Sequence, residues 1–145
     1  QLEEAEVIRQ VEQDRLNLSA LCGYEVVGMA YPCGGINNDD RTAAIIRDNT
    51  GVKYARALES SGGFEPQENL YRFQSSVYHM DFDKMMEMAE EFAAITPTSP
   101  KIFYIWGHSD EFDIGDTWTR FEEFLKFISG RSDIFYGTNK DILLP

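Results

Sequence analysis

Hydrophobic and polar positions along this chain repeat with two different periods, and each period predicts a different kind of element. Apolar residues spaced three and four positions apart predict helices near residues 1–22, 39–50, 81–96 and 116–129. Short runs of β-branched and aromatic residues between these segments predict strands over residues 24–32, 52–58, 71–79, 102–106 and 134–138. Strands that alternate with helices favour a parallel sheet with right-handed connections, so the pattern predicts an α/β fold.

The first helix is expected to carry Ile8, Val11, Leu18 and Leu21 on its apolar face, and Gly23 follows it as a left-handed stop. No strand precedes this helix in the sequence. A strand and helix repeat that begins on a helix suggests that the first strand of the pattern lies upstream. We therefore expect residues 1–145 to form a single domain that is part of a larger α/β unit.

Composition and charge exclude several classes of partner. The chain has 145 residues, of which 43% are hydrophobic, and its formal net charge is −12. Such an acidic chain without a basic cluster repels phosphate backbones and anionic lipid, so we expect neither nucleic acid nor membrane partners. No apolar run approaches the roughly 20 residues that a membrane-spanning helix needs.

Cysteines and methionines are most simply structural here. Cys22 and Cys33 match neither a zinc-ligand spacing nor a disulfide framework, and we expect both to be small, semi-buried residues. Met85 and Met88 share a helical face with Ala89 and Phe92, a spacing that predicts core packing rather than a soft-metal site.

Candidate chemistry centres on the two histidines of the chain. His79 and His108 each follow a predicted strand, and the carboxyl ends of parallel strands meet at one edge of a sheet. His108 follows Trp106 and Gly107 and precedes the acidic run Asp110-Glu111, which is most simply a solvated face. Either histidine could instead be structural, buried or tucked beneath a loop.

No complete catalytic constellation is present in the sequence alone. There is no phosphate-binding loop and no nucleophile elbow, and no two histidines are spaced three or four apart on a helix as metal ligands. Ser109 beside His108 is not a nucleophile and base pair, because adjacent residues of an extended chain point in opposite directions. A catalytic function would therefore require reactive or metal-binding groups in addition to those of this sequence.

Several segments in order resemble the C-terminal part of the polysaccharide deacetylase family, also called the NodB homology domain. The segments that carry the resemblance are VVGMAYPCGGIN, VKYARAL, SVYHMDF, KIFYIWGHSDEFD and DIFYGTN. The resemblance implies a partial (β/α) barrel with about five parallel strands, and a hydrolase that removes N- or O-linked acetyl groups from carbohydrates. It also implies one divalent metal, zinc or similar, for the complete family domain.

The family's first two motifs, which supply its base and its metal ligands, have no counterpart in this sequence. By this resemblance we expect a truncated part of a deacetylase that is inactive alone, with no metal bound by this chain alone.

The resemblance assigns catalytic roles to two residues, the backbone amide of Cys33 as an oxyanion donor and His108 as the general acid. The arginine that the family carries beside this turn falls at Ala30 here. The substrate-binding positions that it implies are Tyr31, Pro32, Gly34, His79 and Trp106. Each retains a structural alternative, with Cys33 as a plain turn residue and the histidines as packed loop residues.

A second class of function is compatible with the same sequence. The chain could be a non-catalytic carbohydrate-binding or structural half-barrel that completes itself by oligomerisation. The expected partners are therefore an acetylated carbohydrate and a homo-oligomer that covers the open barrel wall, since exposed apolar surface and unpaired strand edges favour association.

Overall fold

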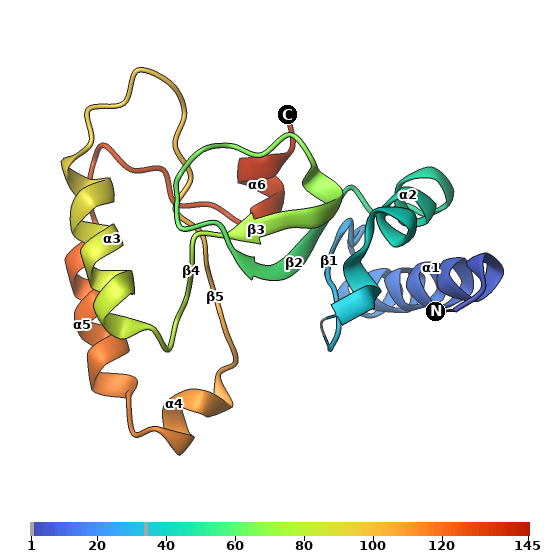
Figure 1. The fold of residues 1–145 in the computed structure, drawn as a ribbon, viewed down its shortest axis with the longest axis horizontal. Coiled ribbons are helices and arrows are strands. Elements are labelled where there is room, and N and C mark those ends of the chain that lie inside the picture. Colours follow the sequence, from blue (N-terminus) through green and yellow to red (C-terminus); the bar gives the residue numbers. More distant parts are fainter. Residues whose placement is uncertain (1, 34) are drawn as a thin grey trace. The chain divides into compact units, whose positions relative to one another are not determined.

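The computed structural model describes residues 2–33 and 35–145. In this part of the chain the helices are α1 (Glu4–Cys22), α2 (Asp40–Asn49), α3 (Phe82–Ala94), α4 (Asp110–Ile114), α5 (Trp118–Ile128) and α6 (Asn139–Leu143). The strands are β1 (Gly28–Ala30), β2 (Tyr54–Ser60), β3 (Phe73–Ser75), β4 (Val77–Tyr78) and β5 (Ile105–Trp106). Two short 3-10 helices, η1 (Gly35–Asn38) and η2 (Leu70–Arg72), complete the regular elements (Figure 1).

The strands form two small sheets. One has the order β1-β2-β3, with β1 and β2 parallel and Gly28 opposite Tyr54. The other pairs β4 with β5, also parallel, with Tyr78 opposite Trp106. The fold is thus mixed α/β with parallel strand pairs, and the described residues form no closed barrel. The partial barrel that the resemblance implies stays a prediction.

The chain divides into two compact units. The first unit comprises residues 1–58, 67–74 and 136–145, and the second comprises residues 59–66 and 75–135. A single domain over residues 1–145 stays a prediction, because one domain can contain two such units.

In the first unit, helices α1 and α2 lie side by side (Figure 1). Helix α1 ends where Gly23 adopts a left-handed φ of 74° and donates its N–H to the carbonyl of Ser19. Helix α2 begins where the Asp39 carboxylate accepts a hydrogen bond of 2.8 Å from the Thr42 amide. The core of this unit consists of Val7, Tyr31, Ile45, Ile46, Val52 and Ala55.

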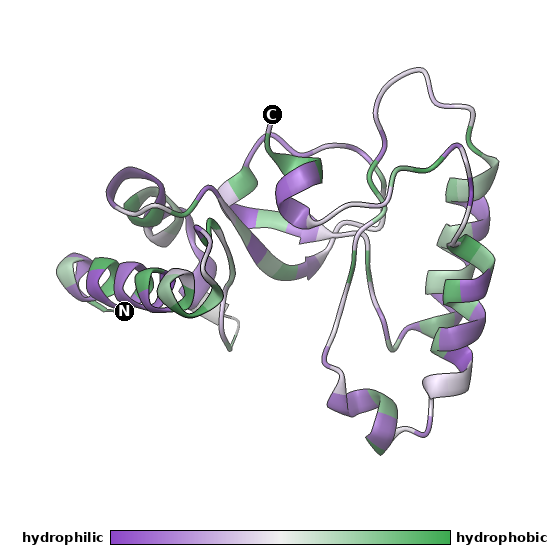
Figure 2. Ribbon diagram, turned by 180° about the vertical axis from the view of Figure 1, so that it is seen from behind, coloured by the Kyte–Doolittle hydropathy of each residue, from purple (hydrophilic) through white to green (hydrophobic). Residues whose placement is uncertain are grey.

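In the second unit, α3 and α5 lie side by side and enclose an apolar core (Figure 1). Both helices carry hydrophobic as well as hydrophilic residues, as helices with one face on the core do (Figure 2). The buried residues of this core are Phe64, Val77, Phe82, Met85, Met88, Ala89, Phe112 and Phe124. The predicted core packing of Met85 and Met88 is confirmed, and Phe92 packs partly buried against the same cluster.

Four predicted strands differ from the structure. Of the predicted strand 102–106, only Ile105 and Trp106 pair with a neighbour. Only residues 28–30 of the predicted strand 24–32 pair with a neighbour. The predicted strand 71–79 is divided into the end of the 3-10 helix η2 and the strands β3 and β4, and these two strands belong to different sheets. Residues 134–138 form no strand, and Thr138 instead caps α6 by a reciprocal capping box with Asp141. In the last case the local capping groups outweigh the β propensity of the apolar residues before them.

The expected burial is also wrong at several positions. On α1 the buried residue is Val7, whereas Leu18 and Leu21 are exposed, Leu21 to 83%. The apolar face of α1 therefore ends near its middle, because α2 covers only part of the helix. Cys22 and Cys33 are both exposed thiols rather than semi-buried residues.

Candidate functional site

Strands β4 and β5 bring the two histidines together at one end of their sheet. His79 follows β4 directly, and its amide donates to the carbonyl of Trp106 over 2.9 Å. His108 follows β5 after Gly107, and its amide lies 3.2 Å from Nε2 of His79. The expectation that both histidines lie at the same edge of a sheet is confirmed, because parallel pairing aligns the two strand ends.

Gly107 makes this approach possible. A Cβ atom at Gly107 would lie 1.4 Å from Cδ2 of His79, so no side chain fits at this position while the His79 ring is in place. The imidazole of His79 therefore packs against the backbone of the β5 end, and only 2% of His79 is exposed.

The carboxylate of Glu111 joins both histidines. Oε2 lies 2.7 Å from Nε2 of His79 and 3.1 Å from Nδ1 of His108, and it accepts the His108 amide at 3.1 Å. Oε1 accepts a hydrogen bond from the Tyr78 hydroxyl. Glu111 reaches these groups because it lies on the first turn of α4, three residues after His108. We call Tyr78, His79, His108 and Glu111 the Glu111 cluster.

Hydrogen bonding makes this carboxylate a stable anion. The Tyr78 hydroxyl is the largest cause and lowers the pKa of Glu111 to about 2, with further contributions from His79 and from the amide and ring of His108. Burial of Tyr78 and its bond to Glu111 raise the pKa of Tyr78 to about 12. Glu111 is thus ionised and Tyr78 is protonated throughout the neutral range.

Aromatic rings enclose the buried side of the cluster and leave His108 open. The ring of Phe112 lies 4.4 Å from the His79 ring, and the ring of Trp106 lies 5.1 Å from Tyr78 and 5.7 Å from His108, between ring centres. The side chain of His108 is 62% exposed. One histidine is therefore a buried member of the cluster and the other presents its ring to solvent.

The turn after β1 lies in the first unit. Tyr31 is buried, its hydroxyl donates to the Tyr71 carbonyl over 2.9 Å, and burial raises the pKa of Tyr31 to about 12. The carbonyl of Pro32 accepts from the Asn37 side chain. Cys33 is exposed with a φ of 58°, a left-handed conformation that is uncommon outside glycine. The predicted substrate-binding position Gly34 lies outside the described residues.

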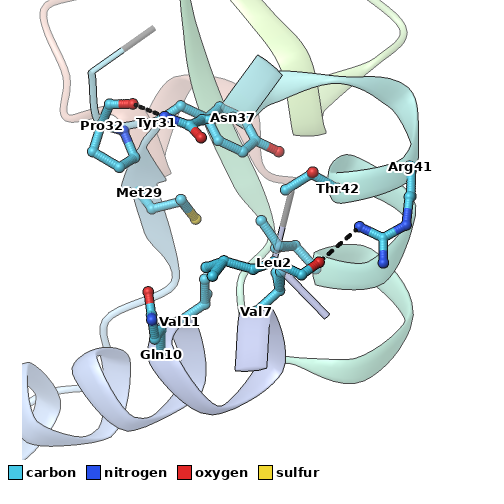
Figure 3. Close-up of a pocket in the computed structure, with 11 residues that line it drawn as sticks. Leu2, Val7, Gln10, Val11, Met29, Tyr31, Pro32, Asn37, Arg41 and Thr42 are labelled. Atoms are coloured by element: carbon cyan, nitrogen blue, oxygen red, sulfur yellow. Dashed lines mark hydrogen bonds between the residues drawn. The ribbon is translucent and has the colours of Figure 1, made fainter. Parts of the chain in front are cut away.

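A cavity of about 260 Å³ lies beside this turn (Figure 3). Val7 and Val11 of α1, Met29 of β1 and the rings of Tyr31 and Pro32 contribute to its lining. Its other side is formed by α2, where Arg41 donates to the backbone carbonyl of Leu2 (Figure 3). The lining is mainly apolar, which suits contact with aliphatic or aromatic groups more than with ions.

The structure thus groups the predicted site residues into two sets. His79, Trp106 and His108 are neighbours in the second unit, and Tyr31, Pro32 and Cys33 follow one another in the first. Their predicted roles toward a substrate stay predictions.

Sequence reasoning missed Glu111 and Tyr78. It assigned the run Asp110-Glu111 to a solvated face, which holds for exposed Asp110 but is wrong for the half-buried Glu111. The available signal was the spacing of three residues between His108 and Glu111, which brings two side chains together on one helical turn.

The spacing between atoms of the cluster is that of hydrogen bonds rather than of tetrahedral metal ligands. Tetrahedral bonds of about 2 Å would separate two ligand atoms by roughly 3.3 Å, whereas Nε2 of His79 and Oε2 of Glu111 are 2.7 Å apart. Within residues 2–33 and 35–145, no group of three or more histidine, cysteine, aspartate or glutamate side chains is arranged to hold a metal.

Comparisons with protein-family models, with curated proteins and with solved structures found no match. Among the described residues, no helix combines the length and the apolar character needed to cross a membrane.

Proposed function

We propose that this chain is part of a carbohydrate deacetylase, in which His108 protonates the leaving group as the acetyl C–N or C–O bond breaks. The observation that carries the proposal is an exposed imidazole held through one nitrogen by an ionised carboxylate. Nδ1 of His108 faces Glu111. The acid is therefore the doubly protonated ring, which gives the proton on Nε2 to the leaving group and becomes neutral with its remaining proton on Nδ1. The segment resemblance described above supports the acetylated carbohydrate as the substrate class.

The turn at Cys33 supplies the second group of the proposed site, a backbone amide that stabilises the oxyanion. The resemblance assigns the oxyanion-stabilising amide to Cys33, and its left-handed backbone is a strained conformation of the kind found at functional sites. An amide that points to the developing oxyanion stabilises the transition state more than the ground state. The apolar cavity beside Tyr31 and Pro32 offers contact area for a sugar ring or an acetyl methyl group.

The divalent metal of the resembled family has no ligand set among the described residues, so we derive no step through it. In this proposal the base and the metal ligands belong to the two family motifs that the sequence lacks, and the chain alone does not hydrolyse acetyl groups.

The test compares residues 1–145 alone with a protein that joins them to the family's first two motifs. Only the joined protein should release acetate from acetylated chito-oligomers. There, His108→Ala should lower kcat by roughly 10²–10⁴-fold without changing metal content, which is the range for loss of a general acid. Asp110→Asn, an exposed neighbour on α4, is the matched control and should leave kcat unchanged. An unchanged kcat in His108→Ala, or acetate release by the chain alone after chelation, would contradict the proposal.

A second candidate is a non-catalytic half-barrel that binds carbohydrate and associates with another copy. The observation that favours it is the exposed apolar surface at the end of α1, where Leu16, Leu21 and Tyr24 all face solvent. Glycan binding by residues 1–145, together with no acetate release from the joined protein, would select this candidate over the first.

A further inference from the structure

His79 is a buried titratable group that the proposed reaction does not use. Its Nδ1 atom is buried and has no hydrogen-bond partner among the described residues, while its Nε2 atom lies 2.7 Å from Oε2 of Glu111. A buried polar atom without a partner costs free energy, and the bond between the other ring nitrogen and Glu111 offsets part of that cost. The contact with Glu111 is therefore the feature that holds the His79 ring in place.

The protons in this cluster can be assigned from which atoms can donate. Ionised Glu111 has no proton to give, so its short contact with His79 requires the proton on Nε2 of His79. The His108 amide can only donate, and with His79 Nε2 protonated it donates to Glu111. By the same argument, the contact between Oε2 and Nδ1 of His108 requires a proton on Nδ1.

Four donors then satisfy the carboxylate. They are the Tyr78 hydroxyl, Nε2 of His79, and the amide and Nδ1 of His108. Three of these donors meet Oε2 and one meets Oε1, so both oxygens of the carboxylate are held and its orientation is fixed. The Nε2 atom of His108 has no protein partner within residues 2–33 and 35–145 and lies on an exposed side chain.

We propose that Glu111 is the positioning residue of His108, and that Tyr78 and buried His79 hold its carboxylate so that His108 keeps its Nδ1 protonated and its Nε2 directed to solvent. The two histidines of the chain consequently hold opposite neutral tautomers. The tautomers follow from the structure of the cluster alone, and only their catalytic use rests on the proposed function.

The groups around the cluster support this assignment. Strand β4 contributes the Tyr78 hydroxyl, the β5 end contributes the ring of Trp106, and α4 contributes Glu111 and the charge of Asp110. Phe112 covers the His79 ring on the remaining side. Glu111 is therefore the acceptor that both imidazoles share.

The experiment is nitrogen-15 NMR of the imidazole side chains in residues 1–145, which distinguishes the two neutral tautomers of each ring, recorded in alkaline buffer. Because the chain has two histidines, each spectrum contains two ring systems, and His79→Gln assigns them. The wild-type protein should show one ring protonated at Nε2, His79, and one protonated at Nδ1, His108. In Glu111→Gln, His108 should shift toward the Nε2-protonated form that free histidine favours.

Two further variants make the test specific. Tyr78→Phe removes one donor to Glu111 with little change of shape and should shift His108 partly in the same direction. Asp110→Asn removes a charge from the same helical turn but no hydrogen bond of the cluster, and should leave both tautomers unchanged. Far-ultraviolet circular dichroism verifies that each variant is folded, and Tyr78→Phe carries the test if Glu111→Gln is not.

Protonation of His108 at Nε2 in the wild type, or an unchanged tautomer in both Glu111→Gln and Tyr78→Phe, would overturn the positioning role. These outcomes are independent of catalysis. Failure of His108→Ala to lower kcat in the joined protein would overturn the proposed function and leave the tautomer assignment standing.

Discussion

At the scale of single residues, Gly107 shows how an absent side chain creates a site. Its Cα hydrogen occupies the space where a Cβ would meet the His79 ring at 1.4 Å. The buried imidazole can therefore reach Glu111 beside the end of β5. Gly107 does not adopt a left-handed φ. The position therefore requires glycine for its small size and not for its backbone conformation.

We expect Gly107→Ala to lower the free energy of unfolding by about 3 kcal/mol, at the upper end of overpacking costs. The added methyl group forces His79 out of its place and breaks its bond to Glu111. Gly63→Ala is the matched control, since a Cβ there meets no atom within 4 Å. Urea denaturation of the two variants measures the difference, and equal stability would show that the His79 ring moves at little cost.

Glu111 predicts a dependence of stability on pH. The Tyr78 and histidine donors lower the pKa of Glu111 from 4.5 to about 2 in the folded chain. Its contribution to stability is therefore fully present above pH 4.5 and is lost as the pH falls toward 2, because the unfolded chain takes up the proton first.

Acid unfolding of wild type and Glu111→Gln should test this. The wild-type protein should lose more stability than the variant between about pH 5 and pH 2. Glu123→Gln, at an exposed position of α5, is the control and should follow the wild type. Parallel curves for wild type and Glu111→Gln would mean that the cluster does not hold the carboxylate in solution.

At the scale of elements, the buried face of α3 follows the helical period of its sequence. Met85, Met88 and Ala89 are almost completely buried, whereas Met86 is only half buried. Met85→Ala should lower the free energy of unfolding by about 2–5 kcal/mol, as large-to-small core substitutions do. Met86→Ala should cost substantially less, and thermal or urea unfolding compares the two. Equal losses would place the core boundary elsewhere on the helix.

Elements with strong local signals could be predicted from the sequence. Helix α1 is capped by Gly23 and α2 by Asp39, because a left-handed glycine and a capping carboxylate act within one turn. The edge that carries both histidines was also predictable, since it follows from parallel pairing alone. In contrast, the division of residues 71–79 between two sheets depends on which strands they meet, and no local pattern records that choice.

The candidate site could be predicted only in part for the same reason. His108 was apparent because it follows an apolar strand, but Tyr78 and Glu111 became visible only once β4, β5 and α4 were in place. A half-buried glutamate in an acidic run has the sequence pattern of a solvated surface. Its four hydrogen-bond donors come from the ends of two strands, β4 and β5, and their convergence is a property of tertiary structure.

At the scale of the whole molecule, the exposed apolar residues at the end of α1 predict self-association. Leu21 is 83% exposed and Tyr24 is 66% exposed, in a chain whose net charge of −12 otherwise keeps molecules apart. We expect light scattering to show a mass that rises with concentration and with added salt, which screens the repulsion. Leu21→Ser should reduce this rise, and Leu70→Ser, at a half-buried position away from α1, is the comparison. A monodisperse monomer over a wide concentration range would exclude this association.

The contact between Gly107 and the ring of His79 also links the two positions in evolution. A lineage that gained any side chain at position 107 would first have to replace His79 by a smaller residue, and Glu111 would then lose one of its donors. Substitutions at these three positions should therefore occur together in related sequences, in that order. A related chain that keeps histidine at 79 and a side chain at 107 would need a different backbone path at the end of β5.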